Sequence, residues 1–396
     1  MAMYMKFVQS LCILLAMMIA VTVGLLNGHF AMWFAQAAIM NSTSSRIRRI
    51  GGNGELSDIG EDELIEQQMM QWVEYMGTRN HSASQVANKV FMPFSFLVVD
   101  TNGGNGHFTS IQQAVDSLEV LSARRVIILI NPGTYREKLK IPWNKPYITL
   151  QGTGATSLCV IEWDDTADKV ASDGQRLGTF NTATVTIDAP YFVARNLTFK
   201  NTASPPTSGS RNKQASAVRV SGDASTFVGC QFLGSQDTLY DHKGRHFFQD
   251  CYIEGSVDFI FGDGLSLYRN SHLHAVSANY EALTAQSRSS PLEQSGFSFV
   301  NCKVTGSGLL YLGRAWGTFS RVVYAYTYMD NIIVPEGWND WGDSNRERTV
   351  YYAEYKCYGP GANPQGRVAW SHQLSDQEAQ PFLGLNFVDG YEWIGL

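Results

Sequence analysis

A unit of about twenty residues recurs through the middle of the chain, and it limits the possible folds more than any other feature. Each copy has the form apolar-x-x-(Cys or Asn)-x-apolar. Aligned by eye, the copies begin at Val193, Phe227, Phe248, Leu267 and Phe299. They lie 21 and 19 residues apart where no insertion intervenes, and 34 and 32 residues apart where one does. A repeat of this length with inward apolar positions is typical of a solenoid.

The segments around these copies are rich in Val, Ile, Phe and Thr and are broken by Gly, Asn and Asp, as in VIILINPGTY and ATVTIDAPYFVARNLTF. Such composition predicts short β-strands. An antiparallel sandwich would also contain short strands, but it would not require a repeat. We therefore expect an all-β fold, a right-handed single-stranded parallel β-helix with a few short peripheral helices, one of them over 109–118.

The cysteines fit this interpretation. Cys230, Cys251 and Cys302 fall at one position of the repeat. Successive coils of a solenoid lie roughly 4.8 Å apart, so equivalent positions stack. We expect these three side chains to form a buried ladder. The sequence has no CxxC pair of the kind that binds zinc, and an odd number of cysteines beyond Cys12 does not suggest a disulfide framework.

The N-terminal region differs from the rest. Residues 11–26, LCILLAMMIAVTVGLL, are almost entirely apolar, and Ala35-Gln36-Ala37 offers a small-x-small cleavage site. An uncleaved signal anchor is the alternative, because the apolar character continues beyond the core. Both interpretations export the rest of the chain, and three Asn-x-Ser/Thr triplets fit a secreted glycoprotein. The expected parts are a signal peptide or anchor over 1–37, a linker with a short helical extension over 38–91, and the β-helix domain over 92–396.

The charge balance excludes one class of partner. The chain has 30 Lys and Arg residues against 36 Asp and Glu residues, a net charge of −6. A nucleic-acid-binding protein would need a basic face, so we expect no nucleic acid partner.

The repeat brings acidic residues together. Asp237 and Asp258 each lie ten residues after the first residue of their repeat unit, so they should occupy the same position on consecutive coils. Gln236 directly precedes Asp237, and Gln214 lies 22 residues earlier, about one coil back. Two carboxylates and two amides should therefore converge on one face.

Two carboxylates this close cannot both ionise cheaply, so they should titrate as a pair with separated pKa values. Arg314, in YLGRAWG, is the leading candidate for the cation that keeps one of them charged. The alternative is that the stacked residues cap turns or bind calcium. Only Asp241 and Asp263 are near enough in sequence to complete an oxygen cage, which favours catalysis.

These groups suffice for ester hydrolysis. An ionised Asp can act as nucleophile, a protonated carboxyl can supply a proton to the leaving group, and amide N–H groups can stabilise an oxyanion. No metal or organic cofactor is required. The sequence has no GxSxG elbow. His242 and His246 are expected to be loop or groove residues and not catalytic ones.

Five ordered blocks resemble one family. They are GTYREKL, KQASAVRV, GSQDTLY, GSVDFIFG and YLGRAWG. Over about 300 residues, from FLVVDTNGGNG to DGYEWIGL, the chain resembles plant pectin methylesterases of the short type that lacks an inhibitor-like pro-domain. The resemblance implies hydrolysis of the methyl esters of cell-wall homogalacturonan, giving de-esterified pectin and methanol.

The resemblance also implies roles for individual residues. Asp258 corresponds to the nucleophile. Asp237 corresponds to the acid that protonates methanol and then, as base, activates water. Gln236 and Gln214 would stabilise the oxyanion, and Arg314 would hold Asp258 ionised and contribute to substrate binding.

Further positions would bind the sugar. Trp316 would line a subsite, and Thr184 matches another substrate-contacting position. Tyr240, Phe259 and Trp338 are weaker candidates for the groove. The chain departs from the common family pattern in having QASAV and LGRAW, which replace no functional group.

The expected partners are methylesterified homogalacturonan and, from the resemblance, a proteinaceous pectinesterase inhibitor. We expect a secreted monomer in the cell wall or apoplast. Two alternatives remain: another pectin-active β-helix enzyme, such as a lyase or glycoside hydrolase, and a non-catalytic wall-binding protein on the same scaffold.

Overall fold

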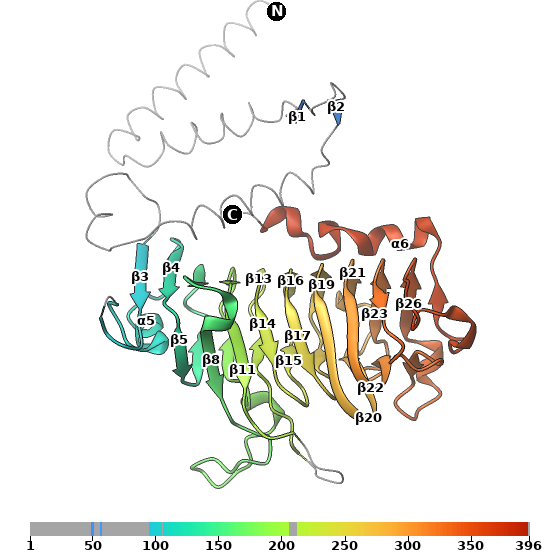
Figure 1. Ribbon diagram of the computed structural model, residues 1–396, viewed down its shortest axis with the longest axis horizontal. Helices are drawn as coiled ribbons and strands as arrows, with labels where there is room; N and C mark the ends of the chain where they lie inside the picture. Colours follow the sequence, from blue (N-terminus) through green and yellow to red (C-terminus); the bar gives the residue numbers. More distant parts are fainter. Residues whose placement is uncertain (1–48, 51–55, 58–94, 105, 206–211, 395–396) are drawn as a thin grey trace, which may run out of the picture. The chain divides into compact units, whose positions relative to one another are not determined.

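The computed structural model describes residues 49–50, 56–57, 95–104, 106–205 and 212–394 (Figure 1). The chain divides into two compact units, Met1–Met70 and Gln71–Leu396. In the first, the described residues form two short antiparallel strands, β1 (Arg49–Ile50) and β2 (Leu56–Ser57). The leader expected over 1–37 lies outside the described residues, as does the extension over 38–91 except for these strands. No helix within the described part is long and apolar enough to cross a membrane.

The second unit is a coil of parallel strands, in which each strand pairs with its counterparts one coil before and one coil after. The first row forms an 11-stranded sheet. Its members are β3 (Ser95–Val99), β4 (Val126–Ile130), β7 (Ile148–Gly152), β10 (Val193–Arg195), β13 (Ser225–Val228), β16 (Arg245–Gln249), β19 (Leu265–Arg269), β21 (Gly296–Val300), β23 (Arg321–Ala325), β26 (Tyr351–Tyr355) and β27 (His372–Gln373).

Two further rows complete each coil. One contains β5 (Gly133–Arg136), β8 (Cys159–Trp163), β11 (Thr198–Asn201), β14 (Gln231–Leu233) and β17 (Tyr252–Gly255). The other contains β6 (Leu139–Ile141), β9 (Val185–Ile187), β12 (Val218–Val220), β15 (Leu239–Asp241) and β18 (Ile260–Gly262). The long strands β20 (His272–Gln286) and β22 (Lys303–Arg314) run through both rows, and β24 (Tyr328–Met329) and β25 (Trp338–Asn339) follow them. The expected parallel β-helix is confirmed.

The helices are short and lie outside the strands of the coil (Figure 1). The segment expected over 109–118 is α5 (Ile111–Asp116), which begins at the N-cap Ser110. Near the C-terminus, α6 (Asp376–Leu383) begins with a capping box between Ser375 and Glu378. Its Phe382 packs with Val323 and Ala353 of the first sheet. The remaining helical turns are η1 (Thr156–Leu158), η2 (Thr179–Asn181), η3 (Arg346–Arg348), η4 (Pro364–Gly366), η5 (Leu385–Val388) and η6 (Gly390–Glu392).

Two copies of the repeat begin one residue later than the sequence pattern indicated, so their predicted register is wrong. Phe248 pairs with Tyr268 and not with Leu267. In the same way, the residue opposite Phe227 is Ala194 and not the valine before it.

The error has a physical cause, because two successive positions share this corner of the coil. The first turns the backbone with a positive φ, which Asn, Asp and Gly tolerate best. It is occupied by Asn196, Gly229, Asp250, Asn270 and Asn301. The second position points into the core and is occupied by Leu197, Cys230, Cys251, Ser271 and Cys302. A pattern that merged Cys with Asn therefore combined a turn position with a core position.

The predicted cysteine ladder is buried. Cys230, Cys251 and Cys302 are at most 2% exposed, and all three are free thiols. Burial raises the pKa of Cys230 and of Cys302 to about 12, so these thiols stay protonated and apolar.

A continuous stack of aromatic rings runs along the core beside this ladder. Successive centroid distances are 4.8, 4.5, 4.6 and 4.6 Å. The rings belong to Phe227, Phe248, Tyr268, Phe299 and Tyr324. The spacing matches the separation of neighbouring parallel strands, so each coil contributes one ring and the stack keeps the coils in register.

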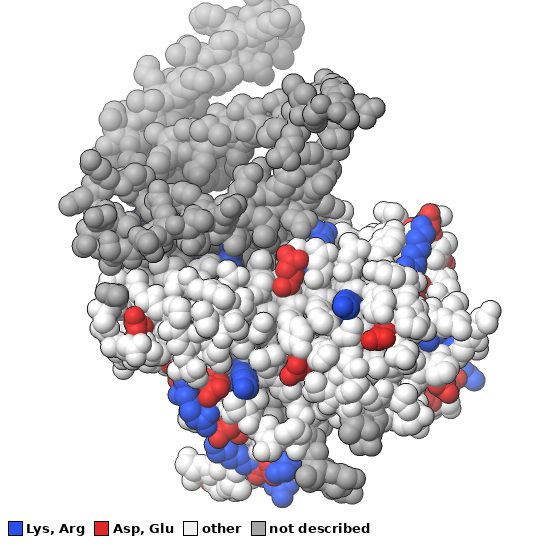
Figure 2. All heavy atoms as spheres, viewed as in Figure 1, with Lys and Arg blue, Asp and Glu red and all other residues white. Residues whose placement is uncertain are grey.

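Charge is unevenly distributed on the surface. In Figure 2 charged side chains gather below β5, β8 and β11 as these strands are labelled in Figure 1, and others are scattered over the right side of this face. The ion pairs in and after these strands are Arg136–Glu162, Arg136–Asp164, Lys138–Asp165, Lys169–Asp165 and Lys213–Asp168.

Candidate active site

Asp237 and Asp258 lie at the same position of consecutive coils, just before β15 and β18. Leu239 pairs with Ile260, which puts the two acids in register. The Asp237 amide donates to the Val257 carbonyl at 2.9 Å, which fixes the two backbones side by side. The adjacency that the repeat predicted is confirmed.

Both acids have a left-handed backbone. Their φ values are 63° for Asp237 and 45° for Asp258. Such a conformation is uncommon outside glycine and costs on the order of 1 kcal/mol. It is held in place on the next coil, where the Ala282 carbonyl accepts a 2.8 Å hydrogen bond from the Asp258 amide. The chain therefore maintains an unfavourable turn at both carboxyl groups, as is common at active sites.

A cation holds one of the two acids. Arg314, the last residue of β22, donates from Nε to Asp258 Oδ1 at 2.7 Å and from Nη2 to Oδ2. This bidentate arrangement fixes the plane of the carboxylate as well as its position. The guanidinium also lies 4.1 Å from the centroid of the Trp341 ring. The expected pairing of Arg314 with Asp258 is present.

The two carboxyl groups differ in electrostatic environment. Burial raises the pKa of Asp237 well above its usual value, and the negative charge of Asp258 raises it further against the opposing effect of Arg314. Burial also raises the pKa of Asp258, but hydrogen bonds and the charge of Arg314 oppose that effect directly. Because only Asp258 has the arginine in contact, it is the member that ionises first, and Asp237 keeps a proton.

Two glutamines lie beside the acids. The Ala215 amide donates to the Gln236 carbonyl at 3.1 Å, which brings the segment carrying Gln214 next to Gln236 on the preceding coil. Both side chains are half-buried. Gln214 Oε1 is buried without a hydrogen-bond partner among the described residues. A buried unpaired amide oxygen costs roughly 1–3 kcal/mol, so it marks a place where a ligand group can bind favourably.

A row of aromatic side chains lies along the same face. Tyr240 stacks on Phe261 at 4.2 Å, and Phe261 lies 6.1 Å from Trp316. At the other end, Phe180 meets Tyr240 edge-on at 6.3 Å. Phe180 and Trp316 are 45% and 40% exposed, which leaves their rings open to a ligand. We call Phe180, Tyr240, Phe261 and Trp316 the aromatic row.

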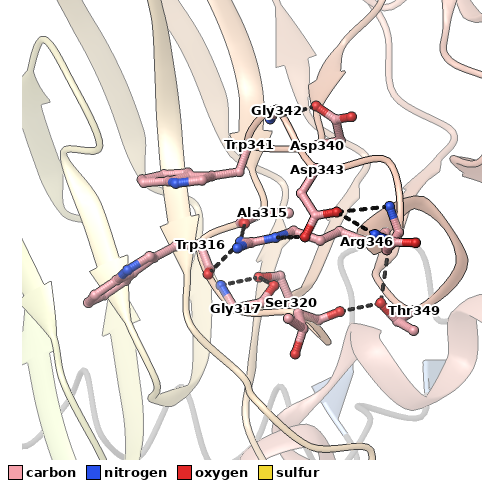
Figure 3. A network of polar contacts seen from close by, with 12 residues as sticks. Ala315, Trp316, Gly317, Ser320, Asp340, Trp341, Gly342, Asp343, Arg346 and Thr349 are labelled. Carbon is pink, nitrogen blue, oxygen red and sulfur yellow. Dashed lines mark hydrogen bonds and ion pairs between the residues drawn. The ribbon is translucent and has the colours of Figure 1, made fainter.

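One arginine fixes the end of this row. Arg346 Nη1 donates to the Trp316 carbonyl at 2.7 Å and also to the Ala315 carbonyl. Asp343 pairs with the same guanidinium at 3.4 Å. In Figure 3 the rings of Trp316 and Trp341 project in the same direction away from this network. Arg346 therefore ties the turn that carries Trp341 to the end of β22.

Some predicted residues do not reach the site. Thr184 is fully buried, and its hydroxyl donates to the Lys200 carbonyl at 2.9 Å. Phe259 and Trp338 point into the core instead of the groove, and Trp338 stacks on Tyr352 at 4.4 Å.

The two histidines have different positions. His242 is half-buried and packs against Phe180, at a centroid distance of 5.3 Å. His246 is fully buried, with Nδ1 2.5 Å from an Asp241 oxygen, so its expected place in a loop or groove was wrong. The alternation of β16 turns its side chain into the core.

Phe180, Phe261, Trp341 and Arg346 were missed in the sequence. Phe261 could have been found from strand alternation, because it pairs with Tyr240 on the preceding coil. Trp341 lies three residues after Trp338, and only the turn between them shows which ring faces outward. The described residues include no group of three or more His, Cys, Asp or Glu side chains placed to hold a metal ion.

The family model described as pectinesterase matches residues 97–391. "Pectinesterase QRT1" from Arabidopsis thaliana is 42% identical over 367 residues, covering 89% of this chain and 94% of the relative. "Putative pectinesterase 11" from the same plant is 47% identical over 302 residues, covering 76% and 81%.

Solved structures agree. "Pectin methylesterase from Carrot" matches with a TM-score of 0.69 and 34% identity, covering 75% of this chain and 94% of that one. A pectin methylesterase crystallised in complex with a hexasaccharide matches with a TM-score of 0.64 and 30% identity, covering 74% and 96%.

Proposed function

The chain belongs to the pectinesterase family and hydrolyses the methyl esters of pectin, and we propose that Asp258 is the nucleophile of this reaction and Asp237 its acid and base. The observation that carries the assignment is the bidentate contact of Arg314 with Asp258 and not with Asp237. It supports an ionised, oriented carboxylate in one position and a protonated one beside it.

In the first half of the reaction, an Asp258 oxygen attacks the ester carbonyl carbon. The carbonyl oxygen becomes an oxyanion, which the side-chain N–H groups of Gln214 and Gln236 stabilise. Loss of one such donor typically costs about a hundredfold or more in rate. As the intermediate collapses, the bond to the methoxy oxygen breaks and Asp237 gives that oxygen its proton. Methanol leaves, and the sugar stays attached to Asp258 as an acyl-enzyme.

In the second half, Asp237 is a base. It takes a proton from a water molecule while the water oxygen attacks the acyl carbon, and the bond to Asp258 then breaks. The product is a galacturonic acid carboxyl group, which releases its remaining proton to solvent to give galacturonate, and Asp237 is protonated again. One residue serves both halves because it loses the proton that methanol needs and regains one from water.

The aromatic row would bind sugar rings. Flat rings such as Trp316 pack against the apolar faces of a sugar, and Trp341 adds a second ring beyond Arg314. The hexasaccharide complex of a related enzyme supports an extended polymer as the ligand. We propose methylesterified homogalacturonan as the ligand.

The remaining assignments follow from the family and the leader. We propose a secreted enzyme of the plant cell wall, with a signal peptide or anchor over 1–37, a linker and extension over 38–91, and a catalytic domain over 92–396. The family model over 97–391 supports the last of these. A proteinaceous pectinesterase inhibitor is the proposed regulatory partner, and the enzyme is proposed to act as a monomer.

The test is release of methanol from highly methylated pectin by the purified chain. Asp258→Asn keeps the size of the side chain but removes the nucleophile, so release should fall by several orders of magnitude. Asp116→Asn is the matched control, because Asp116 is exposed on α5 and far along the coil from the site. Shortening of the polymer, unsaturated products or unchanged activity of Asp258→Asn would overturn the proposal.

A further inference from the structure

Strand β20 is longer than its neighbour at the level of the active site. Five positions separate Gly255 from Ile260 on one coil, but nine separate their partners Ala275 and Thr284 on the next. The additional residues of β20 lie where its register with β22 shifts, between Val276 and Tyr280. Irregularities of this kind are frequent beside active sites, where they re-aim side chains.

This irregular segment lies against the nucleophile. The Ala282 carbonyl accepts the 2.8 Å hydrogen bond from the Asp258 amide, and the two residues before Ala282 are Tyr280 and Glu281. Tyr280 pairs with Leu309 of β22. These two side chains are 64% and 39% exposed, so they form an apolar surface open to solvent. We call Tyr280, Glu281 and Leu309 the β20–β22 wall.

Glu281 brings a third carboxylate to the site. It is half-exposed, and its charge interacts with both Arg314 and Asp258. Burial and the charge of Asp258 raise the pKa of Glu281, while Arg314 lowers it. Arg314 already donates hydrogen bonds from Nε and Nη2 to Asp258. Its positive charge is therefore shared between two carboxylates and does not serve Glu281 alone. The wall is therefore apolar and negatively charged.

The reaction changes the charge of its ligand at this place. The ester is neutral, whereas the galacturonate product is an anion that would lie beside the ionised Asp258 and Glu281. Like charges at short range repel, and more strongly where water is partly excluded. We propose that the β20–β22 wall selects methyl-esterified over free galacturonate next to Asp258 and expels the carboxylate product. This inference rests on the proposed function.

The two parts of the wall have separate tasks. Tyr280 and Leu309 pack against the neutral ring and its methyl group, whose burial is favourable. Glu281 contributes little to binding of a neutral ester but opposes binding of a carboxylate. Removing the charge should strengthen product binding without strengthening substrate binding.

The first experiment is binding of a fully de-esterified galacturonate hexamer to native protein and to Glu281→Gln, measured by titration calorimetry. We expect several-fold tighter binding to Glu281→Gln at low salt. The difference should shrink at high salt, since ions screen a partly exposed charge. Glu281→Asp should resemble the native protein. Glu119→Gln is the matched control, because Glu119 is exposed near the first coil and carries the same charge.

The second experiment is methanol release. Glu281→Gln should be inhibited by the de-esterified hexamer at several-fold lower concentration, with KM for highly methylated pectin unchanged. Tyr280→Ala should raise that KM, and should weaken inhibition by the de-esterified hexamer less, because the hexamer lacks the methyl group that Tyr280 would cover.

The possible failures can be told apart. Equal hexamer affinity of native protein and Glu281→Gln at low salt would overturn the inference, as would an equal effect of Glu119→Gln. Absence of methanol release by the native protein would overturn the proposed function instead, and the calorimetric comparison does not depend on it.

Discussion

Arg314 holds Asp258 across an intervening strand. Asp258 lies two residues before β18, which pairs with β20, and β20 pairs with β22, whose last residue is Arg314. The proposed nucleophile and its counter-ion therefore come from coils that are not neighbours. The long arginine side chain spans the coil between them and reaches the carboxylate with a 2.7 Å contact from Nε.

The first prediction concerns this contact. Arg314→Lys keeps the positive charge but cannot make two parallel hydrogen bonds to one carboxylate. Hydrogen bonds to charged groups contribute about 1.5–3 kcal/mol, so kcat should fall roughly tenfold to a hundredfold. Methanol release at saturating pectin measures the effect. Arg348→Lys, an exchange at an exposed arginine, is the control, and equal rates for both variants would contradict the assigned role.

The second prediction is a bell-shaped dependence of kcat/KM on pH. Asp258 must be ionised to attack, so activity is lost as the pH falls through its pKa, which burial has raised. Asp237 must be protonated to release methanol, so activity is lost as the pH rises through its pKa, which burial and Asp258 have raised further. The limbs belong to the coupled pair and not to either residue alone. A rate that is constant from mildly acidic to alkaline pH would argue against this acid–nucleophile pair.

The third prediction separates stability from activity. Because the folded-state pKa of Asp237 lies above the unfolded value, its protonated form stabilises the fold at low pH. That contribution is lost as the pH rises through the folded-state pKa. Asp237→Asn should therefore raise Tm relative to native protein at neutral pH, with the gap closing on acidification. Its methanol release should fall by about a hundredfold or more, because the general acid is gone. A lower Tm of Asp237→Asn than of the native protein at neutral pH would show that the buried Asp237 carboxylate does not destabilise the fold.

The fourth prediction concerns a buried acid in the core. Asp241 is fully buried and accepts hydrogen bonds from Tyr268, at 2.6 Å, and His246. Tyr268→Phe leaves a charged oxygen one donor short, which should lower the free energy of unfolding by about 1–3 kcal/mol. Chemical denaturation measures it.

Tyr324→Phe is the control for that measurement. Tyr324 lies in the same aromatic stack, but its hydroxyl donates to the uncharged Leu312 carbonyl at 3.0 Å. Tyr324→Phe should lower the free energy of unfolding by less than Tyr268→Phe does. An equal decrease in both variants would mean that the charge of Asp241 is unimportant. Methanol release at low temperature should be unaffected in both variants.

Much of the site could be predicted because the adjacency of its residues depends only on the number of residues in one coil. The interval between Asp237 and Asp258 equals one coil, so their adjacency needed no knowledge of side-chain packing. Placing Arg314 needed more, since β20 and β22 differ in length and in register from the shorter coils before them. The contact with Asp258 was expected from chemistry, but nothing in the sequence showed that the arginine would reach across a strand.

The wrong predictions concern side chains whose direction, inward or outward, reverses when the register shifts by one residue. Trp338 and Trp341 are three positions apart, yet one is 1% exposed and the other 36%. His246 is polar, but the alternation of β16 buries it, and Asp241 makes that possible. In each case the direction of a side chain depends on a neighbouring coil that the local sequence does not describe.

The aromatic stack has a consequence for how such a chain can change in length. Within the stack each ring contacts only the rings of the adjoining coils, so a complete coil added before Phe180 or after Arg346 would leave the contacts described for the active site unchanged. A single residue inserted between Asp237 and Asp258 would instead separate the acid from the nucleophile and turn one of them toward the core. Insertions and deletions in this enzyme should therefore be tolerated in whole coils at its ends and in surface loops, and be rejected one residue at a time inside it.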